Sequence, residues 1–324
     1  MVEPVKLTSR EEQARRLAES MRRQLGQLCR YLDEPDVVEI SLNADGQVWI
    51  DRLGQAMAPV AAMRAETAEA FIATVASVFR TTVTRENPIL ECELPLDGSR
   101  FEGLIPPVVS APVFSIRRRA SAVFSLADYE AAGIMIAAQR RAIETAIAER
   151  RNILVTGGTM SGKTTLLNAV LAHVVEASPD DRLVIVEDTA ELQCAAPNAV
   201  LLHTSDTVSM QRLLRATMRL RPDRIIVGET RGGEALDLLK AWNTGHPGGA
   251  STVHANSARA GLRRIELLLL ERTENPMREL IAEAIEVIVH IAKTAGSPGR
   301  RIQEIVAVTG LKGSDYVFEA MGEV

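Results

Sequence analysis

A glycine-rich segment that ends in a lysine holds the residue types best suited to chemistry in this chain. Residues 157–164 fit the pattern G-x-x-x-x-G-K-[ST], with an apolar, β-branched run before them and a helical run after them. This strand–loop–helix setting predicts a P-loop, in which backbone N–H groups and the positive end of a helix dipole bind phosphate. The predicted loop residues are Gly157, Gly158, Thr159, Met160, Ser161, Gly162, Lys163, Thr164 and Thr165.

Two loop residues have specific predicted roles, and these imply ATP and Mg²⁺ as ligands. Lys163 would reach the β- and γ-phosphates, and the Thr164 hydroxyl would ligate Mg²⁺. The alternative is a structural glycine turn with an accidental lysine. The motif and its strand–loop–helix context together disfavour that alternative.

A second segment is an apolar strand that ends in a carboxylate. Residues 225–229 read Ile-Ile-Val-Gly-Glu, which is similar to a Walker B segment. We predict that Glu229 polarises the attacking water, directly or through a second water. The alternative is a solvated glutamate at the end of a strand.

Residues 183–186 are predicted to form another buried strand, and two acids follow them. Adjacent carboxylates beside phosphates and Mg²⁺ are suited to act through metal-bound water. We therefore predict a catalytic role for Glu187, and we predict that Asp188 is a Mg²⁺ ligand through water. Both carboxylates could equally cap the next turn.

Two histidines lie around a third strand, residues 249–253. His254 follows this strand at its carboxyl end, which should lie on the same sheet edge as Glu229. We predict that His254 is a catalytic residue that senses the γ-phosphate or a neighbouring subunit. His246 lies in a Gly-Pro turn and is expected to be structural. No further His or Cys is spaced to complete a metal site, so no zinc is expected.

The elements that position these residues predict two domains within the 324 residues. A small α+β domain is expected over residues 1–125, followed by a linker at 126–135. In the first domain we expect helices at 9–32 and 67–79, and strands at 37–40, 47–51, 89–95, 100–105 and 113–117.

Residues 136–324 alternate between strand and helix patterns, which predicts a mostly parallel sheet with helices on its faces. Besides the strands already named, we expect one at 199–202. The expected helices are at 137–149, 208–220, 233–242, 257–271 and 277–286. The last strands, 287–292, 301–308 and 316–320, are expected to be antiparallel. The predicted fold class is therefore α/β, with a P-loop NTPase domain after a smaller α+β domain.

The composition excludes several classes of function. The chain has 46% hydrophobic and 24% charged residues, as in an ordinary soluble globular protein. A net charge of −5 and 3% aromatic residues argue against a nucleic-acid surface. Three distant cysteines fit a reducing cytoplasm. No apolar run is long enough to span a bilayer, so any membrane association is expected to be peripheral.

Four segments, taken in order, resemble those of the type II/type IV secretion traffic ATPase superfamily. They are residues 157–165 (Walker A), 186–189 (an Asp box), 220–231 (Walker B) and 244–257 (a His box). Residues 85–88 and 95–101 are similar to the amino-terminal domain of its conjugal-transfer, TrbB-like branch. The family usually has glycine where this chain has Met160, which puts the geometry or affinity of the loop in question.

The resemblance implies a homohexameric ring that hydrolyses ATP with Mg²⁺. Each subunit would join a PAS-like amino-terminal domain to a RecA-like ATPase domain, with nucleotide between them. In the family, arginines of the amino-terminal domain approach the phosphates, and the matching positions here are Arg100 and the Arg117–Arg118 pair, of which Arg117 is predicted to contact phosphate. Arg231, just past Glu229, is also predicted to contact phosphate. The implied role is a motor of a conjugative type IV secretion system, powering pilus assembly, DNA or protein transfer, or both.

The resemblance also implies partners and a location. The motor would be cytoplasmic and peripheral at the inner membrane, bound to inner-membrane components of the system. DNA would be involved only indirectly, as transported substrate. One alternative is a type II secretion or pilus ATPase, many of which carry a four-cysteine zinc insert that is absent here. A RecA-like DNA translocase is disfavoured by the acidic composition. A non-hydrolysing scaffold is disfavoured by the intact Lys163, Thr164, Glu229 and His254.

Overall fold

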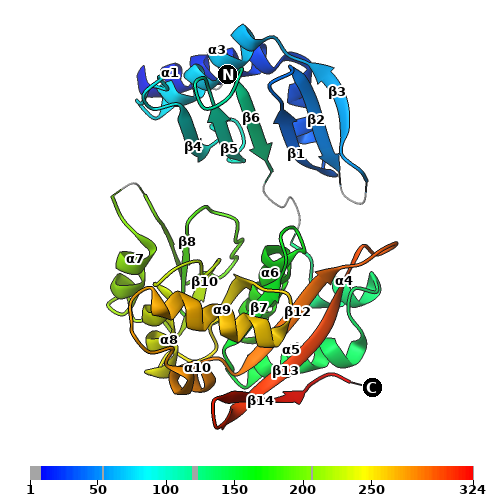
Figure 1. The fold of residues 1–324 in the computed structure, drawn as a ribbon, viewed down its shortest axis with the longest axis vertical. Coiled ribbons are helices and arrows are strands. Elements are labelled where there is room, and N and C mark those ends of the chain that lie inside the picture. The colour runs from blue at the N-terminus through cyan, green and yellow to red at the C-terminus, as the bar shows by residue number, and fades with distance from the viewer. Residues whose placement is uncertain (1–8, 53–54, 119–122, 206, 324) are drawn as a thin grey trace, which may run out of the picture. The chain divides into compact units, whose positions relative to one another are not determined.

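The structure, a computed structural model, describes residues 9–52, 55–118, 123–205 and 207–323. The chain divides into two units, Met1–Ser121 and Ala122–Val324, and each is described by itself (Figure 1). Each unit combines a β-sheet with helices. The fold is therefore mixed α/β, as the sequence predicts.

The first unit is built on an antiparallel sheet with the strand order β3-β2-β1-β6-β5-β4. Its strands are β1 (Val37–Leu42), β2 (Gln47–Arg52), β3 (Ala58–Ala62), β4 (Ile89–Glu93), β5 (Arg100–Leu104) and β6 (Val113–Arg117). Its helices are α1 (Ser9–Leu25), the 3₁₀ turn η1 (Gly26–Leu28), α2 (Cys29–Asp33) and α3 (Ala65–Val78). The two predicted hairpins are confirmed by the pairing of β1 with β2 and of β4 with β5.

The core of this unit lies between its sheet and its helices. Strand side chains alternate between the two faces of a sheet, so in β1 Ile40 and Leu42 are buried while Ser41 is partly exposed. Phe71 of α3 packs against Phe101 and Phe114 of the sheet, with ring centroids 5.6 Å and 5.3 Å away. The rings meet edge-on or tilted, as aromatic pairs prefer.

Two features of the first unit differ from the predicted elements. The helix expected over residues 9–32 is divided, because Gly26 follows α1 with a φ of +54°, outside the helical range. Strand β3 was not predicted. Four of its five residues are exposed, so it lacks the alternation that identifies a half-buried strand.

The second unit is built on an eight-stranded sheet with the order β14-β13-β12-β7-β11-β10-β8-β9. The strands are β7 (Ile153–Gly157), β8 (Leu183–Glu187), β9 (Ala199–His203), β10 (Arg224–Val227), β11 (Ala250–His254), β12 (Val287–Lys293), β13 (Arg300–Lys312) and β14 (Asp315–Ala320). In the part of the sheet ordered β12-β7-β11-β10-β8-β9, all neighbouring strands are parallel. At its end, β13 pairs antiparallel with both β12 and β14. The predicted parallel sheet with an antiparallel end is confirmed.

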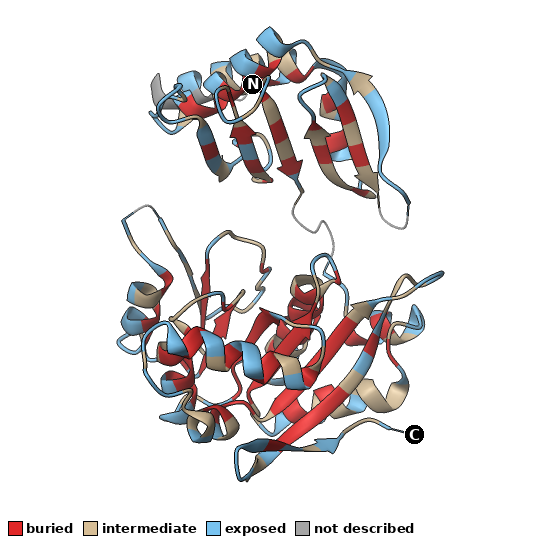
Figure 2. Cartoon of the chain, in the orientation of Figure 1, coloured by how far each residue is buried: buried red, intermediate tan, exposed pale blue. Residues whose placement is uncertain are grey.

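Helices cover both faces of this sheet. They are α4 (Leu126–Ala131), α5 (Ala137–Ala148), α6 (Lys163–Ala177), α7 (Met210–Thr217), α8 (Ala235–Asn243), α9 (Ala258–Leu270) and α10 (Arg278–Ala284). Leu154 of β7 packs with α8, α9 and α10, whereas Ile153 and Val155 pack with α5 and α6. Burial on both faces explains why the central strands read as continuous apolar runs (Figure 2).

The segment expected to be a linker, residues 126–135, contains α4 and the turn after it. The Ser125 side chain caps α4, and Leu126 and Tyr129 are buried in the core that α5 and α6 also line. This segment therefore packs with the second unit. Of the helices in the described part of the chain, none combines the length and apolar character needed to cross a bilayer.

A buried ion cluster stabilises the amino ends of the parallel strands. Arg224 at the start of β10 is 1% exposed, and its Nε lies 2.7 Å from Oδ2 of Asp181. The other carboxylate oxygen lies 2.6 Å from Nη2 of Arg150. Burial alone would raise the pKa of Asp181, but the hydrogen bonds from Arg224 and Arg150 outweigh it, so this pKa is lowered. The cluster lies at the opposite ends of the strands from the P-loop.

Candidate functional site

The loop between β7 and α6 depends on two of its glycines. A Cβ on Gly157 would lie 2.4 Å from both the carbonyl oxygen of Ile291 and the Oγ of Ser161, so no side chain fits there. Gly162 has a φ of +97°, a backbone conformation that favours glycine. Gly158 and Thr159 lie between them, with Thr159 exposed. The predicted strand–loop–helix is confirmed.

This loop has the donor groups that an anion requires. The first N–H groups of α6, near Lys163, Thr164 and Thr165, have no acceptor within the helix and lie at the positive end of its dipole. The Ser161 hydroxyl is buried and has no hydrogen-bond partner in the described part of the chain. A phosphate group fits these surroundings.

Met160 is the residue of this loop whose conformation is most unusual for its type. Its φ is +58°, in the left-handed region where a side chain costs roughly 1 kcal/mol or more. The side chain itself is 42% exposed. The conformation explains why glycine would suit this position.

Lys163 is buried at the start of α6, and its ammonium group contacts two other segments. Its Nζ donates to the carbonyl oxygen of Gly158 at 3.1 Å and lies 3.1 Å from Nδ1 of His254. His254 is the last residue of β11, where it pairs with Gly157 of β7. This strand register places the histidine beside the loop.

Glu229 and Arg231 continue the line of contacts from Lys163. Nε2 of His254 lies 3.0 Å from Oε1 of Glu229, and Nη2 of Arg231 lies 2.8 Å from Oε2 of the same carboxylate. Glu229 follows β10, which pairs in parallel with β11. The prediction that Glu229 and His254 meet at one edge of the sheet is confirmed.

The protonation of His254 follows from these neighbours. Burial lowers its pKa, and the charge of Lys163 lowers it further, while Glu229 acts in the opposite direction. The ring is therefore neutral at pH 7, with one donor nitrogen and one acceptor nitrogen. Because an ammonium group can only donate, Nδ1 accepts from Lys163 and the Nε2–H group donates to Glu229.

The two acids at the end of β8 have different surroundings. Glu187 is buried, and its Oε1 accepts hydrogen bonds from the N–H groups of Glu191 at 3.0 Å and Leu192 at 2.9 Å. This is the turn-capping arrangement that the sequence left open. Asp188 is exposed, and its Oδ2 lies 3.7 Å from Nη1 of Arg231. Asp188 therefore contacts the Lys163–His254–Glu229–Arg231 line through Arg231.

The predicted Mg²⁺ ligands, Thr164 and Asp188, supply oxygen atoms of the kind that this ion prefers. Thr164 lies in the first turn of α6, and Asp188 follows β8. Mg²⁺ commonly keeps several waters, so one or two protein oxygens of this kind are enough to bind it. Over the ranges that the structure describes, His, Cys, Asp and Glu side chains form no group of three or more that could hold a metal.

Arg100 and Arg117 belong to the first unit. They are cross-strand partners in the pairing of β5 with β6, and Arg117 is exposed. The neighbouring Arg118 is bound within the first unit, because its guanidinium donates hydrogen bonds to the carbonyl oxygens of Glu34 and Val37. Arg118 therefore has a structural role in the first unit.

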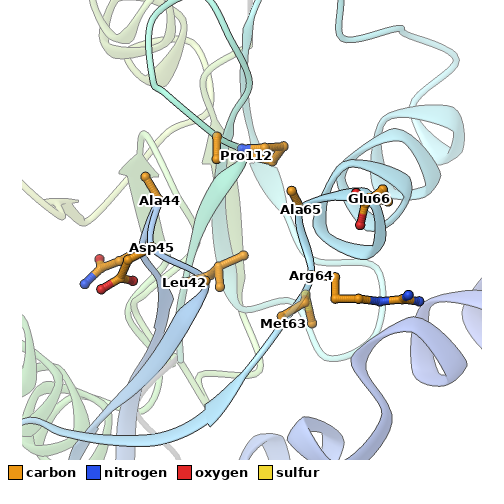
Figure 3. A pocket seen from close by; sticks show the side chains of 11 residues that line it. Leu42, Ala44, Asp45, Met63, Arg64, Ala65, Glu66 and Pro112 are labelled. Carbon is orange, nitrogen blue, oxygen red and sulfur yellow. The ribbon is translucent and has the colours of Figure 1, made fainter.

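The first unit also contains a cavity of about 400 Å³ (Figure 3). It lies between the β1–β2 turn and the start of α3, and its lining includes Asp45, Met63, Arg64 and Glu66. None of the predicted site residues lines it.

Arg300 also lies beside the P-loop, although no motif in the sequence indicated it. A Cβ on Gly162 would lie 2.6 Å from Nη1 of this arginine. Arg300 is the first residue of β13, far from the loop in sequence and outside every motif. No signal in the sequence could have joined the two segments, because their proximity arises from the order of strands in the sheet.

Comparison with known proteins identifies the family. The family described as "Type II/IV secretion system protein" matches residues 22–314. The chain is 54% identical over 306 residues to the probable conjugal transfer protein TrbB of Sinorhizobium fredii, with 94% of each chain covered. It is 53% identical over 310 residues to the conjugal transfer protein TrbB of Rhizobium radiobacter, with 95% of each covered.

A solved structure shares the fold. The ATPase DotB of Legionella pneumophila aligns with a TM-score of 0.62 at 19% identity, covering 94% of this chain and 83% of that one. Since the family match spans both units and the two relatives align over almost their full length, this chain belongs to the type II/IV secretion system protein family.

Proposed function

We propose that this protein is the ATP-hydrolysing motor of a conjugative type IV secretion system. Two relatives that are more than 50% identical to this chain are named as conjugal transfer proteins. This similarity favours the conjugal-transfer branch over a type II secretion or pilus ATPase. The observation that carries the proposal is the continuous line of contacts Lys163–His254–Glu229–Arg231 beside the P-loop. In this proposal the second unit is a RecA-like ATPase domain and the first a PAS-like domain.

In the proposed reaction, Glu229 orients the attacking water, directly or through a second water. Its two carboxylate oxygens are held by His254 and Arg231, so the carboxylate has a fixed orientation. Fixed orientation supports an in-line attack on the γ-phosphorus, because phosphoryl transfer depends mainly on positioning and on charge stabilisation. Glu187 acts as a positioning residue, since its carboxylate caps the turn before Leu192.

His254 is proposed to link the γ-phosphate to Glu229. Lys163 is shared between the Gly158 carbonyl and His254, and phosphate oxygens would compete for the same ammonium group. A change in the contact between Lys163 and His254 is passed to Glu229 through the other ring nitrogen. The histidine can therefore sense whether a γ-phosphate is bound.

Charge on the phosphates is proposed to be balanced by Mg²⁺ and arginines. Thr164 and, through water, Asp188 would hold Mg²⁺, which when bound neutralises charge on the β- and γ-phosphates. Arg231 would contact phosphate from the end of β10, where it already reaches Asp188 and Glu229. Arg100 and Arg117 are proposed phosphate ligands supplied by the first unit.

The proposed assembly is a homohexameric ring, peripheral at the cytoplasmic side of the inner membrane. Its proposed partners are inner-membrane components of the secretion system, and DNA is involved only as transported substrate. Arg100 and Arg117, which the family resemblance implies as phosphate ligands, would complete each nucleotide site from a neighbouring subunit or domain. Closed cyclic symmetry would repeat one interface around such a ring.

Steady-state ATP turnover with Mg²⁺ tests the proposal. We expect wild-type protein to hydrolyse ATP, and Lys163→Ala and Glu229→Gln each to reduce the rate by roughly 100-fold or more. Glu274→Gln, at an exposed glutamate, is the matched control and should leave turnover unchanged. Undiminished turnover by Lys163→Ala would contradict the P-loop assignment. Stimulation by DNA with a steep salt dependence would favour a DNA translocase instead.

A further inference from the structure

Arg300 lies against the P-loop although it belongs to no nucleotide-binding motif. A Cβ on Gly162 would lie 2.6 Å from its Nη1 and 3.6 Å from its Cζ, so the guanidinium covers this glycine. Gly162 immediately precedes Lys163, the first residue of α6. The guanidinium therefore lies beside the positive end of that helix.

The backbone that carries Arg300 is held on both sides. Arg300 pairs with Lys293 of β12, and the turn between them is closed by a 3.0 Å hydrogen bond from the N–H of Thr294 to the carbonyl oxygen of Gly299. Two residues further on, the N–H of Ile302 donates to the carbonyl oxygen of Ile134 at 2.8 Å. A regular strand rather than a loose loop thus positions the guanidinium, as precise binding sites require.

The positive charge of Arg300 is not balanced by an ion pair among the described residues. In the part of the chain that the structure describes, no carboxylate forms an ion pair with this guanidinium. Several other partly buried arginines of the second unit bind a carboxylate: Arg140 binds Glu130, Arg150 binds Asp181, and Arg278 binds Glu266. A cation beside a helix N-terminus is unfavourable.

An anion on the P-loop would remove this electrostatic conflict. The loop also holds the buried Ser161 hydroxyl, which has no hydrogen-bond partner among the described residues. Both observations, the uncompensated guanidinium and the unpartnered hydroxyl, point to a ligand that accepts hydrogen bonds and carries negative charge. The planar fork of a guanidinium matches phosphate oxygens in this way.

We propose that Arg300 is a nucleotide-binding residue that contacts the phosphate chain held by the P-loop. This inference rests on the proposed function, because it assumes that the loop binds a nucleoside di- or triphosphate. It gives the β12–β13 hairpin, which extends the parallel sheet, a part in the nucleotide site. Arg300 and Lys163 would then approach the same phosphate chain from two elements of one subunit.

Calorimetric titration with ATP, ADP and pyrophosphate tests this contact. Arg300→Gln should weaken binding of all three ligands by roughly ten- to a hundredfold, the usual effect of losing a hydrogen bond to a charged group. Arg300→Lys, which keeps the charge but loses the fork, should give a smaller loss. Arg301→Gln is the matched control, because Arg301 is the next residue of β13 and is exposed.

The possible outcomes separate this inference from the proposed function. Failure of the wild-type protein to bind any nucleotide would contradict both. Wild-type affinity in Arg300→Gln would overturn only the role of Arg300. A loss for ATP and ADP with unchanged pyrophosphate affinity would also overturn it, because the contact would then be to base or ribose.

A second measurement uses only the wild-type protein, so it tests the contact even if Arg300→Gln fails to fold. Phenylglyoxal modifies accessible arginines, and mass spectrometry can locate the modified residues in the wild-type protein. Pyrophosphate should protect Arg300 and leave the modification of Arg301 unchanged. Equal modification of Arg300 with and without saturating pyrophosphate would overturn the contact.

Discussion

His254 lies between the ammonium group of Lys163 and the carboxylate of Glu229, and these neighbours influence its protonation state. Burial and the charge of Lys163 hold its pKa below the ordinary value of about 6.5, against the opposing effect of Glu229. The unfolded chain therefore binds more protons than the folded one as the pH falls below about 6.5. The contribution of His254 to the free energy of unfolding is therefore fully present above about pH 6.5. It decreases as the pH falls from about 6.5 towards the lower pKa of the native state.

We expect Lys163→Ala to raise the pKa of His254, because one of the charges that lowers it is removed. An NMR titration of the histidine ring protons measures this change directly. His290 is the internal control, since burial lowers its pKa without any contribution from Lys163. A wild-type pKa of 6.5 or higher for His254 would contradict the neutral ring in the proposed network.

Met160 has a left-handed backbone conformation that a glycine adopts without strain. We expect Met160→Gly to raise the free energy of unfolding relative to Met160→Ala by up to about 1 kcal/mol, because alanine keeps the strain that glycine removes. The two variants lose nearly the same exposed side chain, so their difference isolates the backbone. Urea denaturation monitored by circular dichroism gives the comparison, and a less stable glycine variant would be the opposing result.

The residues of the site could be predicted from the sequence where they belong to a motif within one strand–loop–helix unit. The P-loop and the meeting of Glu229 with His254 follow from local pattern and from the rule that parallel strands share a carboxyl edge. The sequence could not decide between catalysis and turn capping for Glu187, because burial and capping depend on the backbone that follows β8. Arg300 was missed because its neighbour Gly162 is distant in sequence.

At the scale of elements, the ion cluster of Asp181 joins β10 to the segments before β7 and β8. We expect Asp181→Ala to lower the free energy of unfolding by roughly 3–5 kcal/mol, because the buried Arg224 would lose its ionic partner. Asp180→Ala, at the exposed preceding residue, should change it little. Chemical denaturation of the three proteins at pH 7 makes the comparison.

The pH dependence gives an independent check on this cluster. Because the pKa of Asp181 is lowered, its contribution to stability is present above the unfolded pKa of about 3.9 and is lost as the pH falls through the native pKa. The difference between wild type and Asp181→Ala should therefore shrink in strong acid. A difference that stays constant down to the lowest pH would contradict the ionic origin of the stabilisation.

Most elements of the second unit could be predicted because their patterns are strong. Strands buried on both faces give continuous apolar runs, and amphipathic helices give a period of 3.6 residues. Helix α4 was assigned to a linker, because the six-residue helix is too short to show that period. The exposed strand β3 and the break at Gly26 were missed for related reasons, since neither leaves a periodic signal.

At the scale of the whole molecule, we expect subunits to assemble into a hexamer. Light scattering after size-exclusion chromatography, with and without a non-hydrolysable ATP analogue, measures the mass in solution against a subunit of 35.2 kDa. A mass of about six subunits with the analogue is the expected result, because nucleotide at a shared site would favour the ring. A monomer under both conditions would contradict the proposed assembly.

The central claim is that the P-loop between β7 and α6 binds a nucleotide through its phosphates. Calorimetric titration of the folded wild-type protein with ATP and with ADP, each in the presence of Mg²⁺, tests it most directly. We predict saturable binding of both nucleotides, lost in the Lys163→Ala protein. A well-folded wild-type chain that binds neither nucleotide would contradict the claim.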